Sequence, residues 1–219
     1  MSIIFVLYLT VLGSVACIGF WNYARLSGPF RLLVWFLTYV LISETLTRTP
    51  LFAGKAFILY WIYNITALLV YCAILAWLSQ KRSIRFGQIS ILFVSLLLSF
   101  YYLSKGNPFG EFPSILISIS TPILVIGTLL LFVDLLLRDE HTILSRNPEF
   151  ILGASLIIYK CISFVHLSLY DYLIELEVSP WVSIWVHSIA SILYYALFGY
   201  IFILAAKQYR DKCSTSVVR

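Results

Sequence analysis

The sequence predicts an all-α membrane protein, a single domain built as a bundle of seven transmembrane helices. Three observations predict this class: the composition, the length of the apolar stretches and the distribution of basic residues between them. Of 219 residues, 61% are hydrophobic and 11% are charged, whereas a soluble domain carries about a quarter charged residues. A chain this apolar needs lipid as its solvent.

Each of the seven stretches is close to the roughly 20 apolar residues that a membrane-spanning helix needs. The stretches are continuous and rich in Leu and Ile, without the alternation of membrane-barrel strands, so we predict helices. No basic residue precedes the first stretch and no small-residue cleavage site follows it, so we expect a retained helix. In order, the predicted spans are Ser2–Asn22, Phe30–Thr47, Ala56–Ser79, Phe86–Leu103, Pro113–Leu137, Phe150–Tyr170 and Trp181–Ala206.

Lysine and arginine alternate in density along the gaps between the spans. Alternate gaps and the tail hold eleven of them: Arg25, Arg31, Lys81, Arg82, Arg85, Arg138, Arg146, Lys207, Arg210, Lys212 and Arg219. The other gaps hold only Arg48, Lys55 and Lys105. Because basic residues gather on the cytoplasmic side, we predict the N-terminus outside and the C-terminus inside. The net charge of +5 reflects this topology, and no nucleic-acid partner is expected.

Two pairs of spans are alike, which predicts an internal repeat. Spans two and six open with Pro29-Phe30 and with Pro148-Glu149-Phe150. Span three reads WIYNITALLVY from Trp61 and span seven reads WVHSIASILYY from Trp185, with Trp, Ile, Leu and Tyr in register. We expect a 3+1+3 plan of parallel repeats joined by span four, as occurs in transporters. The alternative is that aromatic-rich membrane helices are alike by composition alone.

Polar side chains inside the spans are the candidate functional residues, because they are costly in lipid and are usually functional or paired. Those of spans two, three, six and seven fall at a common depth in the predicted outer third of the membrane. If these helices face a common centre, their polar residues form a pocket that is open to the outside. We therefore predict a ligand site made of Glu44, Tyr60, Tyr63, Asn64, His166, His187 and Tyr194.

Three interpretations of this set stay open. The first is a hydrogen-bonding site for a small solute or a lipid headgroup. The second is a metal site in which His166, His187 and Glu44 hold an ion such as Zn²⁺ and leave a position for water, although no close His pair of a helical metal motif is present. The third is interhelical hydrogen bonding that only holds the bundle together, with Glu44 pairing with Arg48 one turn on.

Two further ionisable residues lie elsewhere in the spans. Lys160 is near the middle of span six, and Asp134 is near the inner end of span five. We predict a structural or gating role for both, in which Lys160 reaches towards Asp134 or towards the aqueous surface. Pro122 should kink span five, which is tolerated near cavities.

The whole chain resembles a group of small, uncharacterised bacterial seven-helix membrane proteins. The shared features are Glu44 at the close of span two, the stretch from Trp61 to Asn64, and the aromatic-rich last span. The resemblance implies the cytoplasmic membrane of a bacterium and no particular activity. In size and repeat plan the chain is also similar to SWEET/PQ-loop transporters, although it has no Pro-Gln pair. In helix count and rim histidines it is similar to zinc-dependent, ceramidase-like hydrolases, although His187 is alone in its helix.

We therefore expect an integral membrane protein that binds a small solute or a lipid headgroup, as a transporter or as an outward-facing sensor. Its expected partners are membrane lipids and a small-molecule ligand, and no cofactor is expected in this function. The short tail is expected to leave no room for a signalling domain, so a sensor would need a separate signalling protein or a homo-oligomer. The alternative is a metal-dependent membrane hydrolase that uses His166, His187 and Glu44.

Overall fold

A computed structural model describes residues 3–47, 49, 56–105, 114–138, 143–168 and 180–216 of the chain. Within these ranges the regular secondary structure is entirely helical. The long helices are α1 (Ile3–Trp21), α2 (Gly28–Leu46), α3 (Ala56–Leu78), α4 (Arg82–Lys105), α5 (Ser114–Leu136), α6 (Pro148–Ser168) and α8 (Pro180–Ser216). Two short 3₁₀ turns, η1 (Tyr23–Arg25) and η3 (Leu144–Arg146), precede α2 and α6.

In the described part of the chain, seven helices are long and apolar enough to cross a membrane. This confirms the all-α prediction and the predicted number of candidate spans. Most of the helices have no marked polar stripe, which is expected when lipid surrounds the bundle and leaves no face to water.

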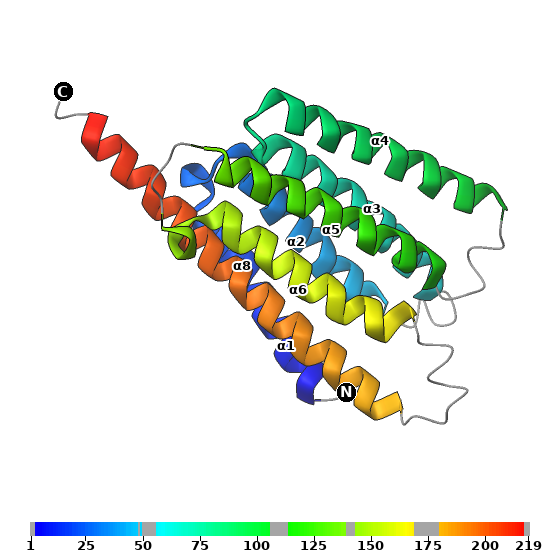
Figure 1. Ribbon diagram of the computed structural model, residues 1–219. Helices are drawn as coiled ribbons and strands as arrows, with labels where there is room; N and C mark the ends of the chain where they lie inside the picture. The colour runs from blue at the N-terminus through cyan, green and yellow to red at the C-terminus, as the bar shows by residue number, and fades with distance from the viewer. Residues whose placement is uncertain are drawn as a thin grey trace.

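α8 is longer than a membrane span requires. Its 37 residues extend over about 55 Å at 1.5 Å per residue, compared with a hydrocarbon core of about 30 Å. The sequence predicts an end at Ala206, where the apolar pattern stops, but the helix continues to Ser216. Lys207, Gln208 and Arg210 are good helix formers, so polarity ends the span without ending the helix. In Figure 1 this C-terminal end of α8 projects past the other helices.

Six of the seven long apolar helices form a closed ring. Around the ring the order is α1, α2, α3, α5, α6 and α8, and α8 packs again on α1. α4 lies outside the ring, against α3 and α5, at one edge of the bundle (Figure 1). Only 17% of the most apolar stretch of α4 is buried, compared with 33–50% for the other six helices. We call the end of the bundle where α1 begins the first end, and the end where α2 begins the second end.

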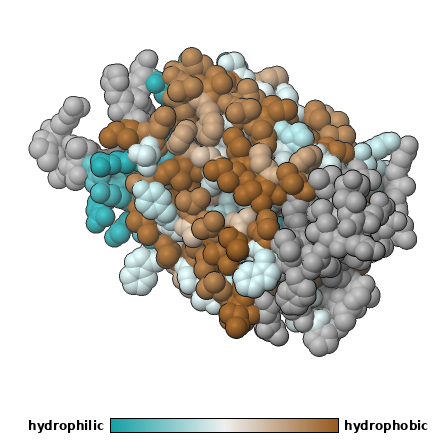
Figure 2. Space-filling model, turned by 60° about the horizontal axis from the view of Figure 1, so that its bottom comes forward, coloured by the Kyte–Doolittle hydropathy of each residue, from teal (hydrophilic) through white to brown (hydrophobic). Residues whose placement is uncertain are grey.

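Large apolar side chains fill the interior of the ring. Leu12 of α1, Leu33 and Leu37 of α2, and Phe198 and Phe202 of α8 are fully buried. The outer faces of the helices expose many further apolar side chains, and the face seen in Figure 2 is mainly hydrophobic, with a group of hydrophilic residues at its left edge. Such a surface is suited to contact with lipid chains.

α5 and α6 pack closely around a glycine. A Cβ atom at Gly153 would lie 2.5 Å from the Phe132 ring and 3.0 Å from the Thr128 methyl group, so only glycine fits without movement. The ring centroids of Phe132 and Phe150 are 5.0 Å apart one turn away. Small residues that let two backbones approach are the usual device of membrane helix pairs, and these contacts fix the register of α5 against α6.

The start of α6 is capped by a side chain. Asn147 Oδ1 accepts hydrogen bonds from the backbone N–H groups of Glu149 at 2.9 Å and Phe150 at 3.3 Å. Pro148 occupies the first helical position, where its missing N–H costs nothing. The sequence pattern of proline and phenylalanine that opens span six is therefore a helix start in the structure.

Candidate functional site

Tyrosines line the interior of the ring from its middle towards the first end. They come from α1, α3, α6 and α8. Both halves of the ring, α1–α2–α3 and α5–α6–α8, therefore contribute. A buried tyrosine hydroxyl needs a hydrogen-bond partner; the Tyr71 and Tyr194 hydroxyls find one in each other, and Tyr159 finds one in Ser191. The group consists of the buried Tyr8, Tyr71, Tyr159, Tyr194 and Tyr195 and the half-buried Tyr63.

Tyr194 connects three helices at the middle of the ring. Its hydroxyl donates a hydrogen bond of 2.8 Å to the hydroxyl of Tyr71 on α3. Its ring stacks on that of Tyr159 on α6, with the centroids 4.1 Å apart and the planes inclined by 8°. The Tyr159 hydroxyl lies 3.4 Å from Ser191 Oγ, and either oxygen can donate. Phe36 of α2 closes the group, with its ring 5.2 Å from Tyr71 in edge-to-face contact.

Tyr195 forms a second group nearer the first end. Its ring centroid lies 5.8 Å from that of Tyr8 on α1. Glu44, half-buried near the end of α2, acts electrostatically on both Tyr8 and Tyr159. The carboxylate and the tyrosines therefore belong to one polar region.

Three of the predicted ligand residues, Glu44, Tyr63 and Tyr194, lie in or beside this region. Asn64 and Tyr60 are linked to each other instead: Asn64 Nδ2 donates to the backbone carbonyl of Tyr60, one turn earlier in α3, at 2.8 Å. Short polar side chains often make such local bonds to their own helix. This amide donor is thus already engaged, and a ligand role for Asn64 and Tyr60 stays a prediction.

The two predicted histidines stand differently. His187 is half-buried, and its ring centroid lies 6.2 Å from that of Tyr159, at the first-end side of the stacked tyrosines. His166 lies on α6, but its side chain falls outside the described residues. Among the side chains that the structure describes, no three His, Cys, Asp or Glu are grouped to hold a metal ion. The Zn²⁺ hypothesis requires His166 and is therefore not tested.

The prediction left out Tyr8, Tyr71, Tyr159 and Tyr195. Ionisable residues were given priority in the spans, and tyrosine is also the residue expected at membrane interfaces. A usable signal was the spacing: Tyr60 and Tyr71 are eleven residues, or close to three turns, apart, which places both on one face of α3. What the sequence lacks is the direction in which that face points.

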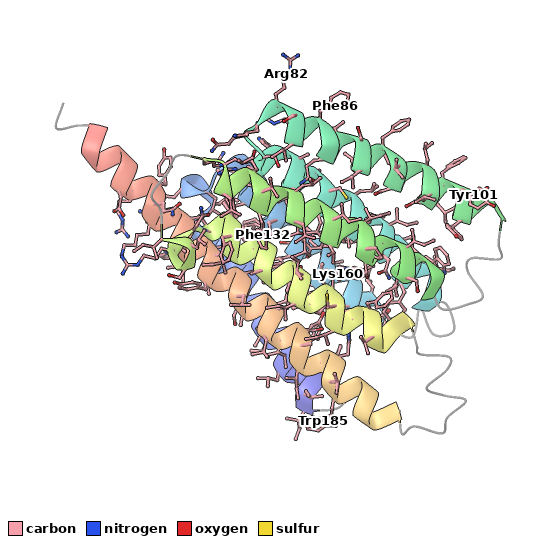
Figure 3. All side chains as sticks on the ribbon, viewed as in Figure 1. Arg82, Phe86, Tyr101, Phe132, Lys160 and Trp185 are labelled. Atoms are coloured by element: carbon pink, nitrogen blue, oxygen red, sulfur yellow. The ribbon has the colours of Figure 1, made fainter. Side chains whose placement is uncertain are left out.

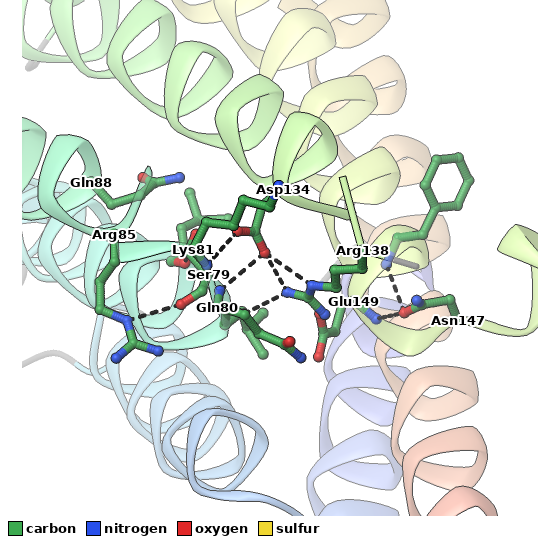
Figure 4. A network of polar contacts seen from close by, with 12 residues as sticks. Ser79, Gln80, Lys81, Arg85, Gln88, Asp134, Arg138, Asn147 and Glu149 are labelled. Atoms are coloured by element: carbon green, nitrogen blue, oxygen red, sulfur yellow. Dashed lines mark hydrogen bonds and ion pairs between the residues drawn. The ribbon is translucent and has the colours of Figure 1, made fainter. Parts of the chain in front are cut away.

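A second polar centre lies at the second end, around Asp134 of α5 (Figure 4). Its carboxylate is fully buried and accepts hydrogen bonds from the backbone N–H groups of Gln80 at 3.0 Å and Lys81 at 2.8 Å, just before α4 begins. It also accepts from Arg138 Nε at 3.0 Å and Nη2 at 2.6 Å. A buried carboxylate is stable only with such a full set of donors.

Arg138 extends this network to α3 and α6. Its guanidinium donates to Glu149 at 2.6 Å and to the backbone carbonyl of Leu78 at 2.7 Å. Burial alone would lower the pKa of Arg138, but the hydrogen bonds to Asp134 and the attraction of Glu149 raise it above its ordinary value. The network therefore stays ionic and joins α3, α5 and α6 with the turn that leads into α4. The position of Asp134 is structural, and its predicted role in gating is not tested.

Lys160 lies midway along α6 (Figure 3) and is buried, with 8% of its surface exposed. Among the described residues, no hydrogen bond or ion pair joins its ammonium group to a partner. Gly153 packs on Thr128 of the antiparallel α5. Lys160 lies seven residues after Gly153 and Thr121 lies seven residues before Thr128, so Lys160 and Thr121 are at the same level. Asp134 is thirteen residues from Thr121 along α5, about 20 Å. Lys160 and Asp134 therefore do not pair, and Arg138 takes the place that Lys160 was expected to fill.

Comparison with known proteins adds no identification. No protein-family model matches the chain, and neither a curated protein nor a solved structure is significantly similar to it. The resemblances to bacterial seven-helix proteins and to SWEET/PQ-loop transporters stay expectations, and the function has to be inferred from the geometry above.

Proposed function

We propose that the protein binds a small solute or a lipid headgroup among the tyrosines of the six-helix ring, and that it is a transporter or an outward-facing sensor. The observation that carries the proposal is the meeting of Tyr71, Tyr159 and Tyr194 from three helices, with Tyr8 of α1 beside the adjacent Tyr195. Aromatic walls with a few convergent polar groups are the usual lining of a small-molecule site. Glu44 supplies a charge beside them and would select for donors on the ligand.

The position of the hydroxyl pair favours transport. Tyr71 belongs to the first three ring helices and Tyr194 to the last three, so a ligand that hydrogen-bonds to this pair would contact both groups. In many transporters the substrate lies where two repeats meet, and rocking of one repeat against the other exposes the site to alternate sides. A sensor needs only one of these two states to be favoured by the ligand.

The arrangement of the helices is compatible with the proposed 3+1+3 repeat. α1–α2 and α5–α6 are neighbours, as are α2–α3 and α6–α8, and the two groups meet through α3–α5 and α8–α1. η1 before α2 and η3 before α6 are equivalent turns in the two halves. In the proposed alignment Tyr63 corresponds to His187 and Tyr71 to Tyr195, and these residues contribute to the same polar region.

The proposed orientation places the first end outside and the second end inside the cytoplasmic membrane of a bacterium. The basic residues of η1, of the α3–α4 turn and of η3 lie at the second end, as the positive-inside rule requires for the cytoplasmic side. Single cysteines at Ser83 and at Thr49 test this, because a membrane-impermeant maleimide added to intact cells should label only Thr49→Cys. Labelling of Ser83→Cys alone would reverse the orientation.

Binding is tested by thermal unfolding of the purified protein in detergent. The probes are glycerol, glucose and inositol as solutes, and phosphocholine and glycerophosphoethanolamine as headgroup analogues. A ligand that raises the unfolding midpoint of the wild type should lose its effect in Tyr71→Phe and Tyr194→Phe. Tyr200→Phe is the matched control, since Tyr200 lies on α8 and is exposed on the outer face. An equal response in all four proteins would refute a site at the tyrosines.

Two further measurements separate the classes of function. Uptake of the ligand into proteoliposomes is expected of a transporter and not of a sensor. Metal analysis of the purified protein tests the hydrolase: stoichiometric metal that is lost in both His166→Ala and His187→Ala would favour the enzyme over the binding protein.

A further inference from the structure

Lys160 lacks a counter-charge in the described part of the bundle. It sits in the middle of a membrane-crossing helix, is 92% buried, and no acidic side chain of the described residues acts on it. Ionisable groups at this depth are ordinarily paired with each other or with a ligand. The lysine thus offers an ammonium group for which the structure supplies no anion.

A second polar group without a partner lies on the facing helix. Thr121 of α5 is 4% exposed, and its Oγ1 has no hydrogen-bond partner. Thr128, two turns on along the same face, shows the ordinary arrangement and donates to the Leu124 carbonyl at 2.8 Å. The equivalent acceptor for Thr121 is the carbonyl of Ile117, but no hydrogen bond forms between this carbonyl and Thr121 Oγ1. The Thr121 hydroxyl is therefore left with an unused donor.

The register of α5 and α6 brings these two groups to one level. Gly153 contacts Thr128 and Phe132, and Phe150 contacts Phe132. In an antiparallel pair, seven residues forward on α6 correspond to seven residues back on α5, which matches Lys160 with Thr121. Seven residues are close to two full turns, so Lys160 also shares the helix face of Gly153 that packs on α5.

Pro122 interrupts the backbone hydrogen bonding of α5 at the same level. It has no backbone N–H and cannot complete the helical hydrogen bond to the carbonyl four residues earlier. Such interruptions are tolerated in membrane helices where neighbouring groups or ligands satisfy the local backbone. A lysine, an unused hydroxyl and a proline therefore coincide at one point of the α5–α6 interface.

We propose that Lys160 and Thr121 form a binding site for a small carboxylate between α5 and α6. The ammonium group supplies the charge and the hydroxyl a second donor, and the two oxygens of a carboxylate can accept from both. A neutral amide or sugar would leave the lysine without a counter-ion, and a cation would be repelled. The site is separate from the tyrosine region, so it extends the protein's ligands to small organic acids whether or not the tyrosines bind a solute.

The test is the binding of benzoate to the full-length protein in detergent. Binding is measured by the change in the unfolding midpoint, with the ionic strength held constant by sodium sulfate. Benzamide is the neutral isostere and sodium chloride the simple anion. Benzoate is expected to raise the midpoint in a saturable manner, and benzamide and chloride are not. Lys160→Met should weaken the apparent affinity for benzoate at least tenfold, and Thr121→Val about threefold or more. Lys207→Met, which removes an exposed lysine of α8, should leave it unchanged.

The stability of the unliganded variant separates binding from scaffolding. If Lys160 serves to bind a ligand, methionine should fit in its place. The Lys160→Met variant without ligand should then unfold at the same midpoint as the wild type or at a higher one. A large drop in the midpoint of empty Lys160→Met would mean that the lysine holds the bundle together, and would overturn the proposal. So would an equal response to benzoate and benzamide, an equal shift with chloride, or an unchanged apparent affinity for benzoate in Lys160→Met. If that variant does not fold, an unchanged affinity in Thr121→Val decides against the site.

Discussion

Replacing Asp134 by asparagine should weaken the bundle at its second end more than any change of one exposed charge. The substitution keeps the shape of the side chain but removes its charge and turns one acceptor oxygen into an N–H donor. That donor must then face either the backbone N–H of Lys81 or the guanidinium of Arg138, which bind the two carboxylate oxygens at 2.8 Å and 2.6 Å. A buried donor is thereby left facing another donor.

The cost can be worked from the bonds that are lost. A hydrogen bond to a charged group contributes about 1.5–3 kcal/mol, and a buried donor without an acceptor costs about 1–3 kcal/mol. Arg138 keeps its bonds to Glu149 and to the Leu78 carbonyl, so its own charge stays compensated. The net loss should therefore fall somewhat below the 3–5 kcal/mol of a fully broken buried pair, at about 2–4 kcal/mol.

Reversible unfolding in mixed detergent micelles, titrated with dodecyl sulfate and followed by circular dichroism, measures this loss. The Arg138→Met variant and the double variant complete a cycle, and we expect the two sites to be coupled by at least about 1 kcal/mol. A free energy of unfolding within about 0.5 kcal/mol of wild type in Asp134→Asn, or additive losses in the double variant, would refute the account of the network.

Three other changes follow from contacts described above. Gly153→Val should cost about 1–3 kcal/mol by overpacking, whereas Gly13→Val, with nothing within 4 Å of its Cβ position, should be nearly neutral; comparable unfolding midpoints in the two would contradict the close packing. Asn147→Ala should lose about 1 kcal/mol with the cap of α6, and Asn147→Asp should retain it in the same titration. Tyr71→Phe and Tyr194→Phe should each cost about 0.5–1.5 kcal/mol, and combining them should add little, because either change alone breaks their shared bond; strict additivity would show that the two hydroxyls do not interact.

The number of spans could be predicted from the sequence because lipid imposes a minimum apolar length. α1 and α3 begin and end within one residue of the predicted limits. The predicted ends are wrong where the helix continues through charged residues that follow or precede the apolar stretch. α4 begins at Arg82, ahead of the predicted Phe86, because the basic residues around it stay helical at the membrane surface. The same reason carries α8 beyond Ala206.

The candidate site was less predictable, since a helix that is apolar all round does not reveal which side faces its neighbours. Tyr63 and Tyr194 were chosen by depth, but Tyr8 and Tyr159 needed the order of helices around the ring. Asn64 is the opposite case: it lies at the predicted depth, but its side chain donates a hydrogen bond to the backbone of its own helix. Neither outcome is encoded in spacing alone.

The place of α4 outside the ring has a consequence for the path of the chain through the membrane. Three crossings leave a chain on the side opposite to its start, so a second group of three would enter inverted. One additional crossing restores the direction, and α1 and α5 then run the same way. α4 supplies that crossing while leaving the six-helix ring closed without it. α4 thus makes the number of crossings before α5 even. A chain cut on either side of α4 should still assemble from its parts. A chain with α4 deleted should insert its last three helices in the inverted orientation.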